Sequence, residues 1–414
     1  MRFILESITK EGSRCGLIKE LGCHANLAIE TPTCLMYTRA GAVPHLTWDL
    51  VENIKRRPQC VQLTCATLVD QQDSLSKFGK GIAQFASIPE DGVIYASIQD
   101  PAHPTRTGYN DKKGVSVFTC AGRTKIDLGL FITLQEAIQP NWFEALCDGD
   151  TPLGCSVKRT RKAVDRTLSL LDACIEAQQK SEKLRQSDIL GVIEGGQIMD
   201  ERQRSAKETA LRPVSGFVLD ALADQQMDSS VKFELIEAVL KELPDSKPRL
   251  LPGVGKPADV LQAVEAGIDI FDSSYPYQVT QRGWALVFPC EVPPVHSQVI
   301  VEADSTGLSQ LQQVKDASDV QGENDQIDPR FELDLSEKRF AEDFSPVLKG
   351  CDCYCCTHHT KAYINHLLNV NELLARVLLM DHNCHHYFEF FHSIRTSLKD
   401  GTFQKLKEAI VNNR

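Results

Sequence analysis

Short apolar runs rich in β-branched residues alternate with longer amphipathic stretches from residue 34 to about residue 289. Eight runs have the length and composition of buried strands, namely 34–38, 60–65, 93–98, 142–146, 189–193, 216–219, 249–254 and 268–271. The segments between them have helical periodicity, most clearly at 157–184, 231–243 and 257–266. This alternation predicts an α/β fold, a (β/α)8 TIM barrel, with a doubly wound open sheet as the alternative.

The pattern changes on both sides of this region. The residues before Cys34 predict a small β element, whereas 291–326 is rich in Glu, Asp, Ser, Gln and Val and has no sustained apolar face. Residues 331–335 alternate as a strand does, and a terminal helix is predicted from about 390 to 410. We therefore expect three segments: a barrel with its β element at 1–290, a flexible acidic insertion at 291–330 and a C-terminal lobe at 331–414.

Three cysteines and a distant histidine have the spacing of a metal site. Cys351, Cys353 and Cys356 lie in one loop, and His382 follows 26 residues later in a segment whose apolar residues recur at helical spacing. One loop that supplies three thiolates and one helix that supplies an imidazole can form the tetrahedron of structural zinc. We expect one Zn²⁺ per chain, bound by these four residues and holding the C-terminal lobe together.

Other cysteines and histidines in the same region are alternative ligands. Cys355 lies inside the loop, Cys384 lies two residues after the histidine, and His386 lies one turn further along the same helical face. We interpret Cys355 and Cys384 as free thiols and the remaining histidines as core or solvated residues. The competing interpretation, in which all of these are ordinary buried side chains, explains the crowding of cysteines less well.

Composition narrows the class of protein. The chain has 414 residues, 42% of them hydrophobic, which is sufficient for a large folded core. Its 15 cysteines are an odd number, and no apolar secretory stretch precedes them, so we expect a reducing, cytoplasmic compartment. No run reaches the 18 apolar residues of a membrane span. The net charge of −11 gives no overall attraction to nucleic acid, so any RNA contact requires a local basic patch or a partner.

Polar residues at the ends of the predicted strands are candidates for chemistry, because barrel active sites lie there. Asp272 follows the eighth run, Glu194, Gly195 and Gly196 follow the fifth, and Asp148 and Asp150 follow the fourth. Paired glycines would let a flat ligand approach the backbone. Each of these residues is also a common turn former, so none decides the function alone.

Several motifs together resemble the tRNA-guanine transglycosylase family over nearly the whole chain. They are the Cys351, Cys353, Cys356 and His382 set, the segments 253–257 and 269–272, the segment 339–344 before the cysteines and the segment 362–367 after them. The resemblance implies a zinc-bearing (β/α)8 barrel that exchanges a guanine in tRNA for a modified base, which in eukaryotes is queuine at the anticodon wobble position. In that family an aspartate attacks the ribose C1′ of a flipped nucleotide, and a second carboxylate moves protons.

The chain departs from the family pattern around the pocket. Asp272 falls on the nucleophile position, but the proton-handling aspartate is replaced by Ala96, with Asp100 displaced by four residues. The family's glycine-rich segment after strand six is replaced by residues 219–224, and a glutamine before the paired glycines has become Glu194, which in its ionised form only accepts hydrogen bonds. Two arginines that meet tRNA phosphates fall on Gln278 and Gln281, while Arg282 is one position off.

A barrel with an intact scaffold and a dismantled pocket resembles the non-catalytic accessory chains of the eukaryotic enzymes. The resemblance implies a heterodimer in which a catalytic chain exchanges the base and this chain binds and orients the tRNA, with a homodimer as another arrangement. It also implies a cytoplasmic location, with peripheral association at the mitochondrial outer membrane. The alternative is a self-sufficient transglycosylase with Asp272 as nucleophile and Asp100, Asp148 or Asp220 as proton carrier. A third hypothesis is a zinc barrel that acts on another purine-like ligand.

Overall fold

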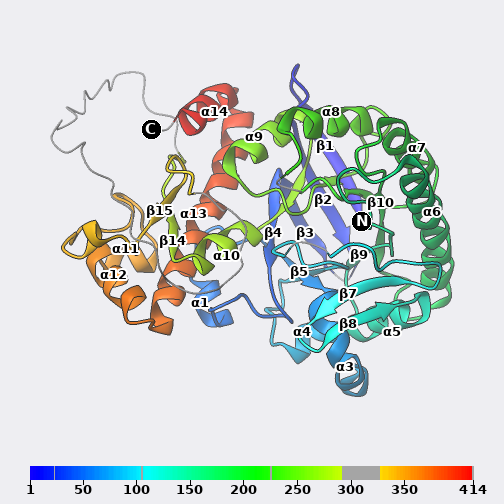
Figure 1. Ribbon diagram of the computed structural model, residues 1–414, viewed down its shortest axis with the longest axis horizontal. Helices are drawn as coiled ribbons and strands as arrows, with labels where there is room; N and C mark the ends of the chain where they lie inside the picture. The colour runs from blue at the N-terminus through cyan, green and yellow to red at the C-terminus, as the bar shows by residue number, and fades with distance from the viewer. Residues whose placement is uncertain (23, 104–105, 224–225, 291–326, 413–414) are drawn as a thin grey trace.

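Eight parallel strands close into a barrel, which confirms the predicted fold class. The computed structural model describes residues 1–414 except 23, 104–105, 224–225, 291–326 and 413–414 (Figure 1). Each predicted run overlaps one strand: β4 Thr33–Tyr37, β5 Cys60–Thr64, β6 Val93–Ser97, β9 Trp142–Glu144, β10 Asp188–Ile193, β11 Gly216–Leu219, β12 Arg249–Leu250 and β13 Ile270–Asp272. β13 pairs with β4 and closes the circle, so the open-sheet alternative is wrong.

Helices cover the outside of the barrel (Figure 1). They are α1 Trp48–Glu52, α2 Cys65–Leu68, α3 Gln72–Phe78, α4 Gly81–Phe85, α5 Leu128–Ile138, α6 Val157–Lys180, α7 Met199–Ala210, α8 Ser229–Leu240, α9 Pro257–Ala266 and α10 Ser274–Gln281. Local sequence fixes several starts, since the Ser156 hydroxyl caps α6 and Pro257 occupies the first turn of α9. The predicted helix at 257–266 has the observed bounds, and those at 157–184 and 231–243 correspond to α6 and α8.

The predicted β element at the N-terminus is a three-stranded antiparallel sheet, with β1 Arg2–Ile8, β2 Arg14–Leu21 and β3 His24–Thr31. It covers the end of the barrel where the strands begin. Arg14, fully buried, donates to the carbonyl of Asp245 at 2.9 Å and lies 3.2 Å from the carboxylate of Asp269, just before β13. The opposite end, where the strands finish, is therefore the mouth of the barrel.

A hairpin that the sequence analysis did not predict lies at this mouth. β7 Val115–Thr119 and β8 Gly122–Ile126 pair antiparallel between β6 and α5. Because the hairpin follows the end of β6, its strands and the loop before them belong to the face on which barrel enzymes carry their sites.

The C-terminal lobe is built on a second small core. β14 Trp284–Leu286 pairs with β15 Glu332–Asp334, and the helices are α11 Tyr354–His358, α12 Lys361–Asn369, α13 Leu373–Lys399 and α14 Phe403–Val411. Residues 291–326 lie outside the described part of the chain, so the insertion and the three segment boundaries stay predictions. The single terminal helix predicted at 390–410 is wrong: α13 begins much earlier and ends before Gly401, which has a φ of 70° and breaks the helix.

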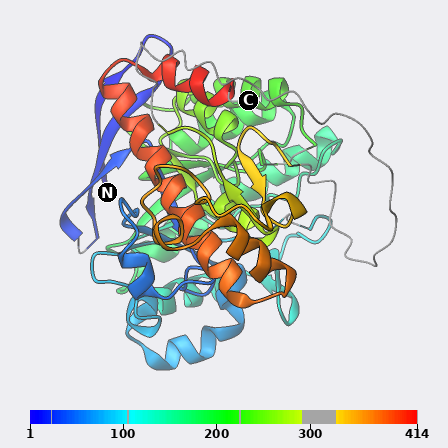
Figure 2. The ribbon, with the colours of Figure 1, turned by 90° about the vertical axis from the view of Figure 1, so that its left-hand side faces the viewer.

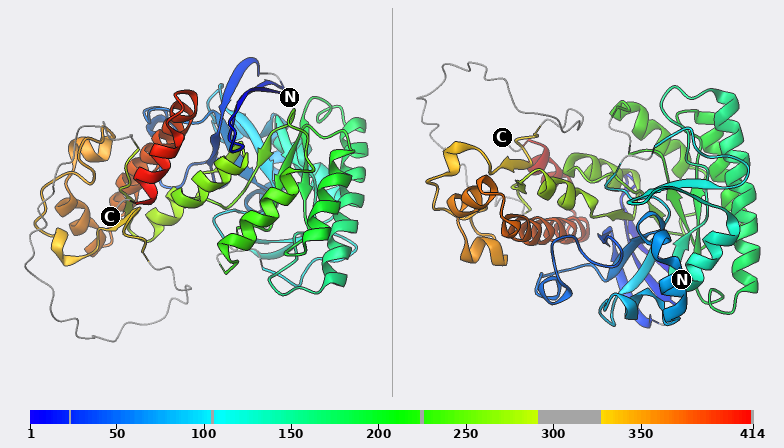
Figure 3. Two further views of the ribbon diagram at one scale, coloured as in Figure 1. Left: turned by 90° about the horizontal axis from the view of Figure 1, so that it is seen from above. Right: turned by 60° about the horizontal axis from the view of Figure 1, so that its bottom comes forward.

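The long helix α13 joins the lobe to the barrel. Its first half packs in the lobe, while Tyr387 donates a hydrogen bond to the carbonyl of Gly255 at 3.0 Å and Phe391 packs against Phe271 of β13. Figure 2 shows α13 running past the barrel toward the N-terminal sheet, and both views in Figure 3 show the lobe to one side of the barrel. The orientation of the lobe is thus fixed by a helix whose far end is barrel core.

Candidate functional site

The structure brings together the four residues that the sequence predicts as a metal site. Cys351, Cys353 and Cys356 lie at the start of α11 and His382 lies on α13, with all four ligand atoms within 4.8 Å of one another. The three sulfur atoms are 3.8, 3.5 and 3.3 Å from Nδ1 of His382. Metal bonds of about 2.0–2.3 Å to nitrogen and sulfur place tetrahedral ligands about 3.5 Å apart. The cluster therefore has the size and donor set that fit a metal ion such as zinc.

The surroundings of His382 prepare its Nδ1 atom for a metal. Nε2 lies 2.9 Å from the carbonyl oxygen of Leu286, which only accepts, so Nε2 carries the proton and Nδ1 has a free lone pair. Hydrogen bonds from the thiols of Cys351 and Cys353 lower the pKa of Cys356 to about 4. Three thiolates at this separation repel one another unless a cation lies between them. The neighbouring thiols of Cys351 and Cys356 raise the pKa of Cys353, so ionisation of Cys353 and Cys356 together requires a bound cation.

The alternative ligands lie outside this cluster. Burial raises the pKa of the Cys355 thiol, and Cys384 packs in the barrel core. His386 is buried against Phe288, with ring centroids 4.5 Å apart, and burial lowers its pKa to about 3. All three belong to packed cores, in keeping with their interpretation as free thiols and a core histidine.

At the barrel mouth, Asp272 is held by the backbone. Its two carboxylate oxygens accept hydrogen bonds from the amides of Gly253 at 2.5 Å and Ser274 at 2.8 Å, and the residue is only 1% exposed. Burial raises its pKa, although the hydrogen bonds from Ser274 and Gly253 act in the opposite direction. A carboxylate in this position would have to give up both contacts to attack a ribose.

The carboxylates near β6 and β9 are engaged in other hydrogen bonds, so neither is free to carry a proton to or from Asp272. Ala96 is fully buried at the position where the family has its aspartate, and both oxygens of Asp100 accept from the Tyr37 hydroxyl, at 2.8 and 3.0 Å. Glu144 on β9 accepts from the Ile98 amide at 2.5 Å and the Tyr95 hydroxyl at 2.8 Å. Burial raises the pKa of Glu144 to about 7. This carboxyl group is desolvated and bonded within the barrel.

The loops after β10 and β11 are filled by a buried arginine. Arg202 of α7 is fully buried and donates to four carbonyl oxygens, those of Gly196 at 2.8 Å, Ile193 at 3.0 Å, Asp220 at 2.7 Å and Ala221 at 3.3 Å. A Cβ on Gly195 would lie 2.6 Å from the backbone nitrogen of Arg202. Gly195 therefore allows the close approach of α7, and the access of a flat ligand to the paired glycines stays a prediction.

Glu194 is the carboxylate of this region with the most unusual environment. It is fully buried, and its carboxylate lies beside Asp220 and the thiol of Cys147, with the ligand atoms of the three within 4.8 Å of one another. Burial, followed by the nearby charge of Asp220, raises its pKa well above the ordinary value. The guanidinium of Arg202 supplies the compensating positive charge. Beside it, Ala221 has a φ of 56°, a conformation that glycine adopts more easily.

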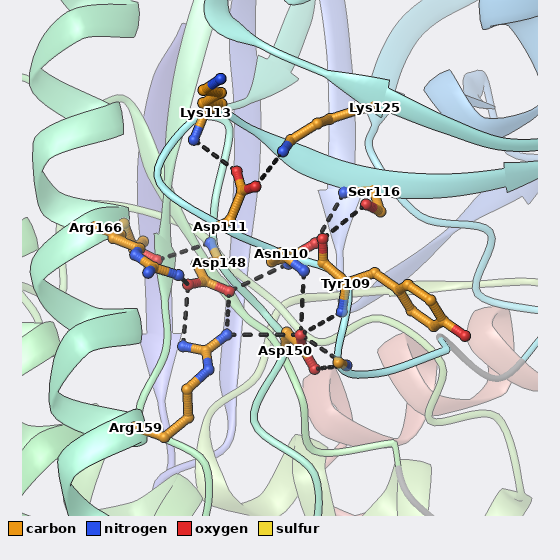
Figure 4. Close-up of polar contacts among 12 residues, drawn as sticks. Tyr109, Asn110, Asp111, Lys113, Ser116, Lys125, Asp148, Asp150, Arg159 and Arg166 are labelled. Atoms are coloured by element: carbon orange, nitrogen blue, oxygen red, sulfur yellow. Dashed lines mark hydrogen bonds and ion pairs between the residues drawn. The ribbon is translucent and has the colours of Figure 1, made fainter.

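Asp148 and Asp150 organise a loop (Figure 4). Arg159 contacts Asp148 through two hydrogen bonds of 3.0 and 2.7 Å, and Arg166 adds a third at 2.9 Å. Asp150 accepts from the backbone amides of residues 108, 109 and 110 at 2.7–3.3 Å. Both carboxylates are almost fully buried, so they anchor the loop that precedes the β7–β8 hairpin. Among the predicted proton carriers, Asp148 is thus occupied by two arginines, and Asp220 lies beside Glu194 and Cys147.

The polar residues on α10 and at its C-terminal end form contacts within the chain. Gln278 donates to the carbonyl of Ala102 at 3.0 Å, and Gln281 contacts His45 at 2.7 Å on the rim of a surface hollow of about 390 Å³. Arg282 pairs with Glu332 at 2.9 Å and stacks on Trp284. These side chains fix α10 and its surroundings, and Arg282 is neutralised by a nearly buried glutamate.

Sequence reasoning missed the residues that fill the mouth. Arg202 and Glu144 were not predicted, because an arginine on a helix is normally solvated and a glutamate within a strand has no sequence signature of its own. One signal was available in the sequence: the polar side chains of Tyr37, Tyr95 and Glu144 lie within strands that are otherwise apolar.

Among the described helices, none combines the length and apolar character needed to cross a bilayer.

Comparison with known proteins identifies the family. A family model described as queuine tRNA-ribosyltransferase matches residues 10–414. Proteins named queuine tRNA-ribosyltransferase accessory subunit 2 are similar over their full lengths: the Homo sapiens protein is 44% identical over 410 residues, covering 98% of both chains, and the Xenopus laevis protein is 42% identical over 413 residues, covering 99% of both. The Trichoplax adhaerens protein of that name is 36% identical over 411 residues and also covers 99% of both chains. The chain belongs to the queuine tRNA-ribosyltransferase family.

Proposed function

We propose that this chain is the accessory subunit of a queuine tRNA-ribosyltransferase, which pairs with a catalytic subunit and helps to bind and orient tRNA while exchanging no base itself. The observation that carries the proposal is the filled barrel mouth. Arg202 and Glu194 occupy the region after β10 and β11, and Asp272 is buried with both oxygens hydrogen-bonded. A flipped nucleotide needs a cavity and a free nucleophile, and these contacts leave neither at Asp272. The names of the similar proteins support the same conclusion.

The lobe offers a surface for the partner subunit. Large apolar side chains are exposed here, including Phe344 and Leu373 at 75%, Tyr354 at 57% and Val370 at 51%. Exposed apolar residues gathered in one region are typical of protein interfaces. We place the contact with the catalytic subunit on this part of the lobe, with a homodimer as the competing arrangement.

In this proposal the metal cluster has a structural role, and we assign zinc to it. Three thiolates and one imidazole are the donors that Zn²⁺ prefers, and a complete protein ligand set leaves no open position for a substrate. Zinc would tie the loop before α11 to α13 and so hold the proposed interface in shape. The predicted cytoplasmic location and the peripheral membrane association stay predictions.

An exchange assay tests the function. The chain alone, the catalytic subunit alone and the mixture are incubated with tRNA and labelled queuine, and incorporation is followed together with any trapped covalent adduct. We expect no exchange and no adduct with the chain alone, and full activity only in the mixture. Asp272→Asn in this chain should leave the activity of the mixture unchanged. Exchange by the chain alone, or loss of activity in the mixture on Asp272→Asn, would favour the self-sufficient enzyme.

A further inference from the structure

A basic and aromatic cluster lies on the β7–β8 hairpin and the loop before it. Between residues 106 and 125 the chain has five cations and one carboxylate, a net charge of +4, although the whole chain has −11. Among the described residues, Lys125 pairs with Asp111, and no ion pair involves Arg106, Lys112, Lys113 or Arg123. Unpaired cations that gather on one element of an acidic protein create a local positive potential.

Two aromatic rings hold the arginines of this cluster in place. The ring of Phe118 lies 4.8 Å from the guanidinium carbon of Arg106, and the ring of Tyr109 lies 5.1 Å from that of Arg123. The two rings contact each other edge to face, with centroids 5.3 Å apart. The result is a stack in the order Arg106, Phe118, Tyr109 and Arg123. A stacked guanidinium retains its hydrogen-bond donors, and its position is fixed before any ligand arrives.

The loop that carries the stack is rigidly attached to the barrel. Asp150 accepts from the amides of residues 108, 109 and 110, as Figure 4 shows. Asn110 accepts from the amide of Ser116 at 2.8 Å and donates to Asp148 at 3.2 Å, so the loop, the hairpin and the segment after β9 form one network. Two nearly buried carboxylates are thus used to hold a surface loop in one conformation. This arrangement is expected of a binding surface rather than of a passive connection.

We propose that this hairpin surface binds the phosphate backbone of tRNA and stacks an unpaired base on Tyr109. The proposal rests on the proposed function and names the surface that carries it out. Guanidinium and ammonium groups interleaved with an exposed aromatic ring are the composition that single-stranded RNA requires, and Tyr109 is 43% exposed. An anionic membrane would also attract the cations, but a membrane surface also takes up exposed aliphatic side chains, and among residues 106–125 no large aliphatic side chain is exposed.

A pair of charge-reversal variants tests the surface. Lys112 and Lys113 are exposed, so Lys112→Glu with Lys113→Glu should leave the fold intact. The matched control is Lys183→Glu with Arg185→Glu, which changes the net charge equally but lies before β10, at the opposite end of the barrel. Binding is measured by the fluorescence anisotropy of labelled tRNA, titrated with the chain and with its complex with the catalytic subunit between 50 and 200 mM salt.

We expect the hairpin variant to bind tRNA at least tenfold more weakly at about 100 mM salt, and the slope of log K against log salt to fall by about 1.5 for two lost phosphate contacts. The control variant should change both values far less. Tyr109→Ala should weaken binding by about tenfold, whereas Tyr109→Phe, which keeps the stacked ring, should not. Equal losses in the hairpin variant and the control, or no loss in either, would overturn the proposal.

Vesicles that contain phosphatidylserine distinguish the membrane alternative. If the hairpin variant loses binding to these vesicles while it keeps its affinity for tRNA, the surface is a membrane contact and the proposal is wrong. If the wild-type complex binds no tRNA, the proposed function itself fails and this inference with it. If the wild-type complex binds tRNA and the hairpin variant binds equally well, only this inference fails.

Discussion

Replacement of Glu144 by glutamine tests whether the buried carboxyl groups of the barrel mouth belong to the fold or to chemistry. Glu144 accepts from the amide of Ile98 and from the hydroxyl of Tyr95. Glutamine has nearly the same shape, and its carbonyl can accept from Ile98 while its amide donates to the Tyr95 oxygen. Glu144→Gln thus removes the charge and retains both contacts, so it mimics the protonated form of the wild-type side chain.

The magnitude follows from the pKa of Glu144. Burial raises this pKa from 4.5 to about 7, so the folded chain holds a proton that the unfolded chain releases near pH 4.5. The stabilisation from this proton is complete below the unfolded value and is lost as the pH rises through the folded one. A difference of this size corresponds to about 3 kcal/mol of unfolding free energy. Glu144→Gln should therefore change stability little at low pH and raise it by about 3 kcal/mol, relative to wild type, at pH 8.

Urea denaturation at several pH values measures this difference, with Glu182→Gln, an exposed carboxylate, as the control that should show no trend. The difference between variant and wild type isolates Glu144 from other titrating groups. A difference that stays constant within about 0.5 kcal/mol between pH 5 and pH 8 would refute the reasoning. The same variant should leave queuine exchange by the mixture with the catalytic subunit unchanged, and a loss of exchange would identify Glu144 as an acid or base of the reaction.

Three further predictions concern the metal, the mouth and the interface. Cys353→Ser should release the zinc and lower the thermal midpoint, whereas Cys355→Ser should retain one zinc per chain; metal analysis and calorimetry check both. Arg202→Lys should lower the free energy of unfolding in urea by about 3–5 kcal/mol, because at least two buried carbonyl oxygens lose their donor. The control Arg204→Lys, on the surface, should lower it by less than about 1 kcal/mol. Leu373→Glu should weaken the heterodimer in analytical ultracentrifugation without lowering metal content, and an unchanged dissociation constant would place the interface elsewhere.

The strands of the barrel could be predicted because parallel strands covered by helices are buried on both faces and form continuous apolar runs. The small hairpin was missed because β8 contains Arg123, Thr124 and Lys125, and its turn has no glycine–asparagine signature. The terminal helix was predicted too short at its start and too long at its end, although Gly401 marks the break. Local signals therefore located the core elements, and errors occurred where solvated residues dominate.

The metal cluster could be predicted because three of its ligands lie within six residues, so their spacing alone limits the geometry. The contacts that fill the mouth of the barrel could not be predicted. They join Arg202 on one helix to loops after two different strands, and no pattern along the chain reveals that a helical arginine turns inward. Absent family residues indicated that the pocket had changed, and only the structure showed what replaced them.

The helix α13 has a consequence for how the molecule unfolds. The same 27-residue helix carries His382 in the metal cluster and Phe391 in the core of the barrel. An element shared by two cores cannot melt in one of them without loosening the other. We therefore expect a single cooperative transition for lobe and barrel, so that loss of the metal proposed for this cluster would expose the whole protein to degradation in the cell.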